Sequence, residues 1–223
     1  MEGLSAVAAS LLYLQLQRLN RLSEIANRYG WRTPLVMLVL AVTRWVRFRE
    51  RLALIRLSLL TRGNKGRRIR LGRHVSLAPG SFLSLDDDIY IGDRCTFEIY
   101  VNPEARVSIG SNTWLSHDLH LQSAAQVTIG RNVLIGEFVS IRDTTHSYQD
   151  PVVPIKNQSD VSNPVIVEDD VWIGRGCLIQ AKAPGIVIGR GSIVGANSVV
   201  TSSIPPMEVW VGTPAKMLKR RPA

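Results

Sequence analysis

Residues 127–141 read "VTIGRNVLIGEFVSI", and a branched apolar residue recurs there every six positions, at Ile129, Ile135 and Ile141. A second apolar residue falls four positions after the first two, at Val133 and Val139. A period of six matches neither the 3.6-residue repeat of a helix face nor the two-residue alternation of a half-buried strand. It predicts the short flat sides of a solenoid, each with two side chains that point inward.

The same period continues along most of the chain after residue 70, with two-residue slips near 85–90 and 123–128. It passes through Leu71, Leu77 and Leu83, through Ile91, Phe97, Pro103, Ile109, Leu115 and Leu121, through Val167, Ile173 and Ile179, and through Ile188, Val194 and Val200. Three sides of six residues, at roughly 3.3 Å per residue, predict a triangular coil of about 18 residues. The spacing from Gly92 to Gly110 would be one such turn. The expected class is therefore mainly β, a hexapeptide solenoid over 71–223.

Positive charge is concentrated before the repeats. Residues 1–70 contain 14 Lys or Arg and 3 acidic residues, a net charge of +11, whereas residues 71–223 contain 13 and 15, a net charge of −2. The basic character therefore belongs to the N-terminal segment. No DNA- or RNA-binding motif accompanies these arginines, so nucleic acid is not an expected partner.

The N-terminal segment 1–63 is predicted to form two α-helices, followed by a basic linker at 64–70. The first helix runs from Leu4 to Tyr29, and the second has Thr33 as its N-cap and ends at Gly63.

The second helix cannot span a membrane, because its uninterrupted apolar run at 35–42 is far shorter than the roughly 20 residues required. One face is apolar and flanked by arginines, which favours a helix lying on an anionic membrane surface. An apolar face packed against another subunit is the alternative. No signal-peptide cleavage pattern is seen, so the expected location is cytoplasmic, peripheral on the cytoplasmic face of the inner membrane. The residues of this face are Trp45, Phe48, Leu52, Ile55 and Leu59.

The repeat stops after Ile141, where "DTTHSYQDPVVPIKNQSDVSNP" intervenes before the period resumes at Val167. We expect residues 147–164 to leave the coil as an excursion loop, with His146 at the point of departure. A solvent-reachable imidazole there could take a proton from a hydroxyl group. Cys95 and Cys177 fall at inward positions instead, so they are expected to fill the core rather than form an acyl-enzyme.

Four stretches resemble the hexapeptide acyltransferases, in the branch of the maltose, galactoside and polysaccharide O-acetyltransferases. They are "VTIGRNVLIGEFVSIRDTTH", "VIVEDDVWIGRGCLI", "VIGRGSIVGANSVVTSSIPP" and "VWVGTPAKMLKRR", and the resemblance covers roughly residues 71–221. It implies a left-handed parallel β-helix, a homotrimer, and acyl-CoA, expected to be acetyl-CoA, bound between neighbouring subunits as co-substrate. No metal would be required.

The resemblance also implies roles for particular residues. His146 matches the general base, and Asp118 falls where the sugar acetyltransferases have an acceptor-binding asparagine. Trp172 would lie beside the pantetheine arm, and a basic C-terminal tail would bind the CoA phosphates. The corner "IQAKAPGIVIG" is three residues longer than usual and is expected near the CoA groove. The other residues expected to bind CoA are Gly174, Arg175, Ala196 and Thr201 along its chain, and Lys216, Lys219 and Arg220 at its phosphates.

The predicted function is O-acyl transfer from acyl-CoA to a hydroxyl of a sugar or surface-glycan precursor. One alternative is a zinc carbonic-anhydrase-like solenoid, with His117, His120 and His146 as candidate ligands. The second is a non-catalytic trimeric scaffold.

Overall fold

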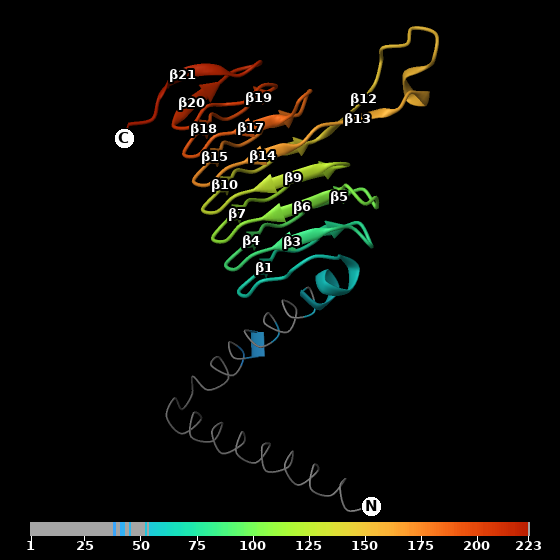
Figure 1. Cartoon of the computed structure of the whole chain (residues 1–223). Coiled ribbons are helices and arrows are strands. Elements are labelled where there is room, and N and C mark those ends of the chain that lie inside the picture. Colours follow the sequence, from blue (N-terminus) through green and yellow to red (C-terminus); the bar gives the residue numbers. More distant parts are fainter. Residues whose placement is uncertain (1–37, 39–40, 43–44, 46–51, 53, 223) are drawn as a thin grey trace, which may run out of the picture. The chain divides into compact units, whose positions relative to one another are not determined.

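The structure is a computed structural model that describes residues 38, 41–42, 45, 52 and 54–222. The chain divides into two compact units, Met1–Arg51 and Leu52–Ala223. In the second unit the chain winds as a parallel β-helix whose coils stack one on another (Figure 1). This confirms the predicted solenoid, while its left-handed winding stays a prediction.

Three sheets form the faces of the coil, each taking one strand from successive turns. The eight-stranded face contains β1 (Arg70–Leu71), β4 (Tyr90–Ile91), β7 (Trp114–Leu115), β10 (Leu134–Ile135), β15 (Trp172–Ile173), β18 (Ile193–Val194), β20 (Glu208–Val211) and β21 (Lys216–Arg220). The six-stranded face contains β2 (Ser76–Leu77), β5 (Thr96–Ile99), β8 (His120–Ser123), β11 (Ser140–Arg142), β16 (Leu178–Gln180) and β19 (Val199–Val200). The five-stranded face contains β3 (Leu83–Leu85), β6 (Arg106–Ile109), β9 (Gln126–Ile129), β14 (Val165–Val167) and β17 (Ile186–Ile188).

Most coils are longer than the predicted 18 residues, so that prediction was wrong. Leu71 pairs with Ile91, an advance of 20 residues, and Ile91 pairs with Leu115, an advance of 24. The five-stranded face accounts for the difference, because each of its strands turns two side chains inward, as Leu83 and Leu85 do in β3. The two-residue slips in the sequence therefore arise from the third side of each turn, which is wider than the other two.

Pro103 is exposed rather than inward, a second correction. It lies in a loop between β5 and β6, where the Asn102 side-chain oxygen accepts hydrogen bonds from the backbone N–H groups of Glu104 and Ala105 at 2.9 and 2.5 Å. Such local side-chain bonds favour turns over strands. The inserted residues make this the 24-residue coil, and the inward pattern resumes at Ala105.

The inward residues form one continuous core along the axis. Ile135, Val139 and Ile141, from the stretch that shows the period most clearly, are fully buried. Burying such a side chain contributes about 1.5–3 kcal/mol. Both cysteines are free and buried, and burial raises the pKa of the Cys95 thiol to about 11. They fill the core, as predicted.

Ion pairs join successive coils at their corners. Arg73 pairs with Asp93 at 2.9 Å, and Arg131 pairs with Asp169 at 2.8 Å. The Arg73 backbone N–H, and then its side chain, hold the pKa of Asp93 below its usual range. Since these pairs are largely exposed, each adds modest stability, and their main effect is to fix the register of the corners.

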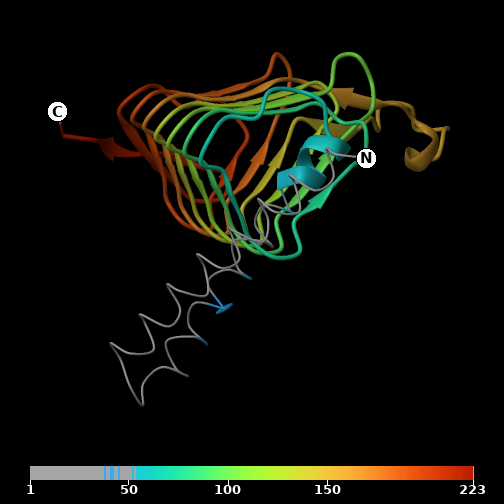
Figure 2. The ribbon, with the colours of Figure 1, turned by 90° about the horizontal axis from the view of Figure 1, so that it is seen from below.

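The predicted first helix lies outside the described residues, and the second is described only in part. Residues 54–60 are helical, and Leu57 is buried in the solenoid core. The helix ends where the Thr61 hydroxyl and backbone N–H both donate to the Leu57 carbonyl, at 2.8 and 3.0 Å. Figures 1 and 2 show this turn of helix against the first coil, where it closes the end of the core.

The predicted linker 64–70 belongs to the compact unit that contains the coil. Arg62 and Lys65 form parallel bridges with Phe82 and Leu85, and Ile69 is buried. Residues before Leu71 therefore already form part of the first coil. In the described part of the chain, no helix has both the length and the apolar character needed to cross a membrane.

Candidate functional site

His146 is the last residue of the first strand of a short hairpin that projects from the coil, and Figure 1 shows this hairpin at β12 and β13. The hairpin pairs β12 (Thr144–His146) antiparallel with β13 (Asp160–Ser162), and a 3-10 turn, η2 (Ile155–Asn157), lies in the loop between them. The predicted excursion thus leaves the coil directly after β11, as the loss of the six-residue period indicated.

Asp143 fixes the base of this hairpin. Its side chain is fully buried and accepts hydrogen bonds from the Ser123 hydroxyl at 2.7 Å and from the backbone N–H groups of Ala124 and Ala125 at 2.7 and 2.9 Å. Its backbone carbonyl accepts from the N–H of Asn163, where the chain returns. A buried carboxylate satisfied in this way is costly to move, so it holds the strand that carries His146 in place.

The imidazole of His146 is paired with Asp160, its partner in the hairpin register. The Nδ1 atom lies 2.7 Å from Asp160 Oδ1, with 68% of the His146 side chain and 33% of the Asp160 side chain exposed. A carboxylate at this distance accepts the Nδ1 proton, which leaves the Nε2 lone pair to accept a proton from another molecule. This pair has the geometry of an oriented general base.

Sequence reasoning missed both Asp143 and Asp160. Asp160 follows His146 by 14 residues through a proline-containing loop, and only the antiparallel pairing of β12 with β13 makes the two neighbours. The sequence did contain a signal for Asp143. The carboxylate of an acidic residue directly after a fully periodic strand must be either solvated or hydrogen-bonded.

A small hollow of about 120 Å³ surrounds the exposed side of this pair. Its walls combine hydroxyl, amide, guanidinium and carboxylate groups, and the Gln180 side-chain N–H donates to the Thr144 carbonyl at 3.0 Å. A polar hollow with a base at its edge can hold and deprotonate a hydroxyl-bearing molecule. Its lining residues are Tyr100, Gln122, Arg142, Thr144, Thr145, His146, Asp160 and Gln180.

Asp118 lies away from His146 within one chain. It lies at the corner before β8, with a positive φ of 59°, and its carboxylate binds Arg94 at 2.7 and 2.6 Å. Hydrogen bonds from Arg94 hold the pKa of Asp118 below its usual range. This corner is at the opposite end of the six-stranded face from the hairpin, so within one chain Asp160, not Asp118, is the acidic partner of His146. A role for Asp118 in acceptor binding stays a prediction.

The residues predicted to bind CoA begin on the eight-stranded face. Trp172 starts β15 with 49% of its area exposed, and the Arg175 guanidinium stacks over Phe138 at 5.3 Å from the ring centre. Gly174 is packed so closely that an added Cβ would lie 2.6 Å from the Ala196 nitrogen. Any larger side chain at Gly174 would therefore push apart two coils at this corner.

The remaining predicted CoA residues lie further along the same end of the solenoid. Thr201 is half-buried just after β19, and Lys216, Lys219 and Arg220 are all exposed on β21. His146 follows the far end of the six-stranded face. Thr201 follows β19 at the same end of the six-stranded face, two coils further on. The other predicted CoA residues occupy different corners of a single chain from His146, and none of the predicted CoA residues lines its hollow.

The longer corner at 180–187 packs against the returning excursion. The Ile186 N–H donates to the Pro164 carbonyl at 2.9 Å, and an added Cβ on Gly185, whose φ is +129°, would lie 2.7 Å from that carbonyl oxygen. The extra residues therefore support the base of the hairpin, one coil beyond His146.

The three histidines of the zinc alternative have separate partners. His117 Nδ1 accepts the Asp93 N–H at 3.0 Å, His120 Nε2 lies 3.2 Å from Glu98 Oε2, and His146 pairs with Asp160. Within the described residues, no three or more His, Cys, Asp or Glu side chains gather in a group that could hold a metal ion.

Comparison with known proteins adds independent evidence. The hexapeptide repeat of succinyl-transferase matches residues 164–202. WbbJ of Escherichia coli K12, named a putative lipopolysaccharide biosynthesis O-acetyl transferase, is 32% identical over 150 residues, which cover 62% of this chain and 75% of that protein. The galactoside O-acetyltransferase of the same strain is 34% identical over 131 residues, which cover 58% of this chain and 62% of that enzyme. The chain spans less than two thirds of the length of several curated relatives that it matches.

Solved structures share the solenoid. The hexapeptide-repeat-containing acetyltransferase VCA0836 from Vibrio cholerae aligns with a TM-score of 0.53 and 27% identity, over 70% of this chain and 73% of that chain. AntD, an N-acyltransferase from Bacillus cereus solved with dTDP-4-amino-4,6-dideoxyglucose and Coenzyme A, aligns with a TM-score of 0.64 and 21% identity, over 78% of this chain and 90% of that chain. The likeness to AntD is a likeness of fold alone.

We predict that Asp160→Asn shifts the proton on His146 from Nδ1 to Nε2. An asparagine amide can turn its N–H toward Nδ1, which would then have to accept rather than donate. Nitrogen NMR of the labelled imidazole measures the two tautomers at a pH where the ring is neutral. Asp150→Asn, in the same loop, is the control, since Asp150 Oδ1 only accepts backbone N–H groups of the loop. Because the asparagine carbonyl could still accept the Nδ1 proton, Asp160→Ala is measured as well, and an unchanged tautomer in both variants would show that Asp160 does not orient the ring.

Proposed function

Because the chain belongs to the hexapeptide acyltransferases, we propose that it transfers an acyl group, acetyl in particular, from acyl-CoA to a hydroxyl group of a sugar or surface-glycan precursor. The observation that carries this proposal is the His146–Asp160 pair at the edge of a polar, solvent-open hollow. The O-acetyltransferase names of two relatives support oxygen as the accepting atom. The bound Coenzyme A in AntD supports acyl-CoA as the donor.

The chain's own groups suit this reaction. His146 Nε2 takes the proton of the acceptor hydroxyl while its oxygen bonds to the thioester carbonyl carbon. The carbon–sulfur bond then breaks, and the imidazolium returns the proton to the departing CoA sulfur. Asp160 keeps the ring oriented and stabilises its positive charge between the two steps. The buried anchor Asp143 keeps the strand beneath them fixed.

The donor requires a flat apolar surface and positive charge, and both are present away from His146. The exposed Trp172 ring offers a surface for the pantetheine arm, and the exposed cations of β21 suit the phosphates of CoA. Because these groups lie on another corner from His146, we infer that a second copy of the chain supplies one half of each site. We therefore propose a homotrimer with acyl-CoA bound in the groove between neighbouring subunits.

The helical residues near the start of the second unit support a peripheral membrane location. Leu52, Ile55 and Leu59 expose 48%, 54% and 80% of their areas, while Leu57 on the other side is buried. Arg56 is also exposed beside them. An apolar face with adjacent cations suits an anionic membrane, so we propose attachment to the cytoplasmic face of the inner membrane, where a lipid-linked glycan precursor would be within reach.

Replacing His146 tests the reaction. His146→Ala should lower kcat by about 10²- to 10⁴-fold, the usual contribution of a general base, with little change in acetyl-CoA affinity. Transfer is measured by mass spectrometry with acetyl-CoA and a panel of bacterial surface sugars. His74→Ala, at an exposed corner of the solenoid, is the control. Wild-type turnover in His146→Ala would contradict the proposed role. Loss of wild-type activity on chelation, with one zinc bound per subunit, would favour the carbonic-anhydrase alternative.

Replacing the exposed helical face tests the membrane proposal. Ile55→Glu combined with Leu59→Glu should abolish sedimentation with vesicles of phosphatidylglycerol and phosphatidylethanolamine, because charged side chains oppose burial in the headgroup layer. Binding of the wild type should weaken with added salt, since screening shortens the reach of charges to about 8 Å at physiological ionic strength. Val152→Glu, on the equally exposed tip of the excursion, is the matched control. A wild type that ignores these vesicles, or a double variant that changes the oligomer instead, would contradict the membrane proposal.

A further inference from the structure

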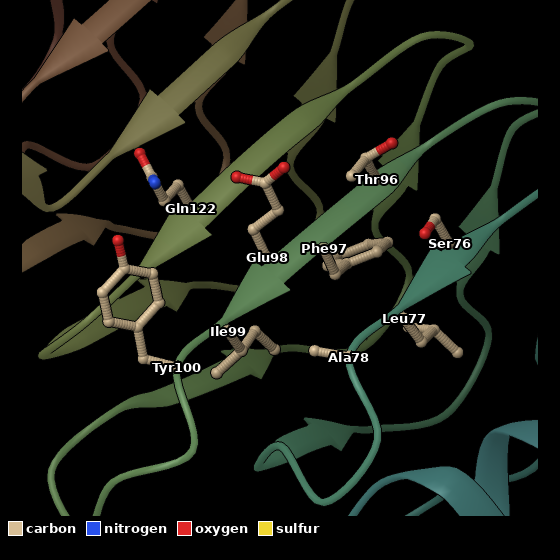
Figure 3. A pocket seen from close by; sticks show the side chains of 9 residues that line it. All are labelled: Ser76, Leu77, Ala78, Thr96, Phe97, Glu98, Ile99, Tyr100 and Gln122. Carbon is tan, nitrogen blue, oxygen red and sulfur yellow. The ribbon is translucent and has the colours of Figure 1, made fainter.

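A second and larger hollow lies on the six-stranded face, closer to the start of the solenoid. Its volume is about 350 Å³, and its walls come from β2, β5 and the residues next to them (Figure 3). No part of the acyl-transfer chemistry derived above uses it. Its lining residues are Ser76, Leu77, Ala78, Thr96, Phe97, Glu98, Ile99, Tyr100 and Gln122.

The two hollows are adjacent. Tyr100 and Gln122 line both the larger hollow and the smaller one around His146. Together they form a groove that crosses from β11 over β8 and β5 to β2, which are neighbours in that order. Three strand spacings of about 4.8 Å give it a span of roughly 14 Å, longer than a single sugar ring requires.

The alternation of side chains along β5 determines which chemical groups face the groove. Phe97 and Ile99 point into the core and are each 1% exposed, so Thr96, Glu98 and Tyr100 point outward. Figure 3 shows the hydroxyl, carboxylate and phenol of these three residues on the same side of the sheet. The Tyr100 ring, 40% exposed, stands where the two hollows meet.

Strand register extends this polar surface toward His146. Glu98 lies beside Gln122, Gln122 beside Arg142, and Arg142 beside Gln180. The row alternates groups that only accept, groups that only donate and amides that do both, which matches the paired hydroxyls of a sugar. His120 helps to hold it, with Nε2 3.2 Å from Glu98 Oε2 and Nδ1 3.5 Å from Arg142 Nη2.

The charges of the larger hollow select against phosphorylated ligands. Its lining contains one carboxylate, Glu98, and neither lysine nor arginine. A phosphate or a nucleoside diphosphate would meet a negative charge with no cation to offset it. The outward polar groups and the exposed aromatic ring suit a neutral polyhydroxylated chain, whose ring faces are apolar and whose edges form hydrogen bonds.

We propose that this groove binds an oligosaccharide acceptor, with the acylated sugar at His146 and the preceding sugars across Tyr100 into the larger hollow. This inference rests on the proposed acyl transfer and specifies its substrate as a glycan of at least two sugars. Thr96 and Glu98 are then specificity-determining residues, which contact the distal sugars and not the reacting hydroxyl.

Binding and turnover are to be measured separately. The His146→Ala protein, which keeps the larger hollow and every other lining residue of the smaller one, is applied to an array of bacterial surface glycans from mono- to hexasaccharides. Affinity for the best-bound series should rise by at least about tenfold, or about 1.4 kcal/mol, between one sugar and three. Adding Thr96→Trp, which fills the larger hollow, should remove that gain. Thr128→Trp, at an outward position of β9 on the five-stranded face, should preserve it.

In the wild-type background, Thr96→Trp should lower the ratio of oligosaccharide to monosaccharide acylation by the same factor. Absence of any dependence on chain length across the array, including absence of all binding, overturns the proposal. So does an equal loss of monosaccharide and trisaccharide binding in Thr96→Trp. If binding depends on length but wild-type protein acylates no glycan, the proposed function fails while the groove assignment stands.

Discussion

Backbone pairing between successive coils is the constraint on which the rest of this structure depends. Apart from β21, which pairs antiparallel with β20, each strand of a face bonds in parallel to the strand one turn away, so every coil must present its inward residues at the same places. Chain that does not fit this spacing has to leave at a corner and return to the same register. The excursion does so between Ile141 and Val165, which pair with neighbouring coils on either side. The position of His146 is therefore a consequence of stacking, and buried Asp143 secures the exit.

Much of the fold could be predicted from the sequence, because the six-residue period reports directly on which side chains point inward. The period did not predict the width of the third side. Leu83 and Leu85 are two residues apart and both point inward, and this spacing on its own looks like an interruption of the six-residue period. Pro103 was misplaced for a related reason: the period continued numerically through a loop that Asn102 folds into a turn. A repeat can be counted in the sequence, but an insertion becomes visible only through the contacts that close it.

The candidate site was less accessible, because half of its chemistry arises from pairing between distant residues. His146 could be singled out as the point where the period fails, but Asp160 becomes its partner only through the hairpin. Asp118 was chosen by its position along a motif, and in one chain it lies at a corner with a positive φ and is bonded to Arg94, so its predicted role in acceptor binding stays a prediction. Gly174 illustrates the reverse case, since the close approach of the next coil explains the residue type at a position first singled out by resemblance.

The separation of His146 from Trp172 and the basic β21 is the feature with the widest consequence, because under the proposed function a single chain would hold only half of each site. The most direct test mixes two inactive variants, His146→Ala and Trp172→Glu, by co-refolding at equal amounts. If neighbouring subunits each supply half of a site, roughly one site in four receives two intact halves, and activity should recover to about a quarter of the wild-type value. Activity that stays at the level of the separate variants, in assemblies shown to contain both chains, would contradict the account and place both halves of the site in one subunit.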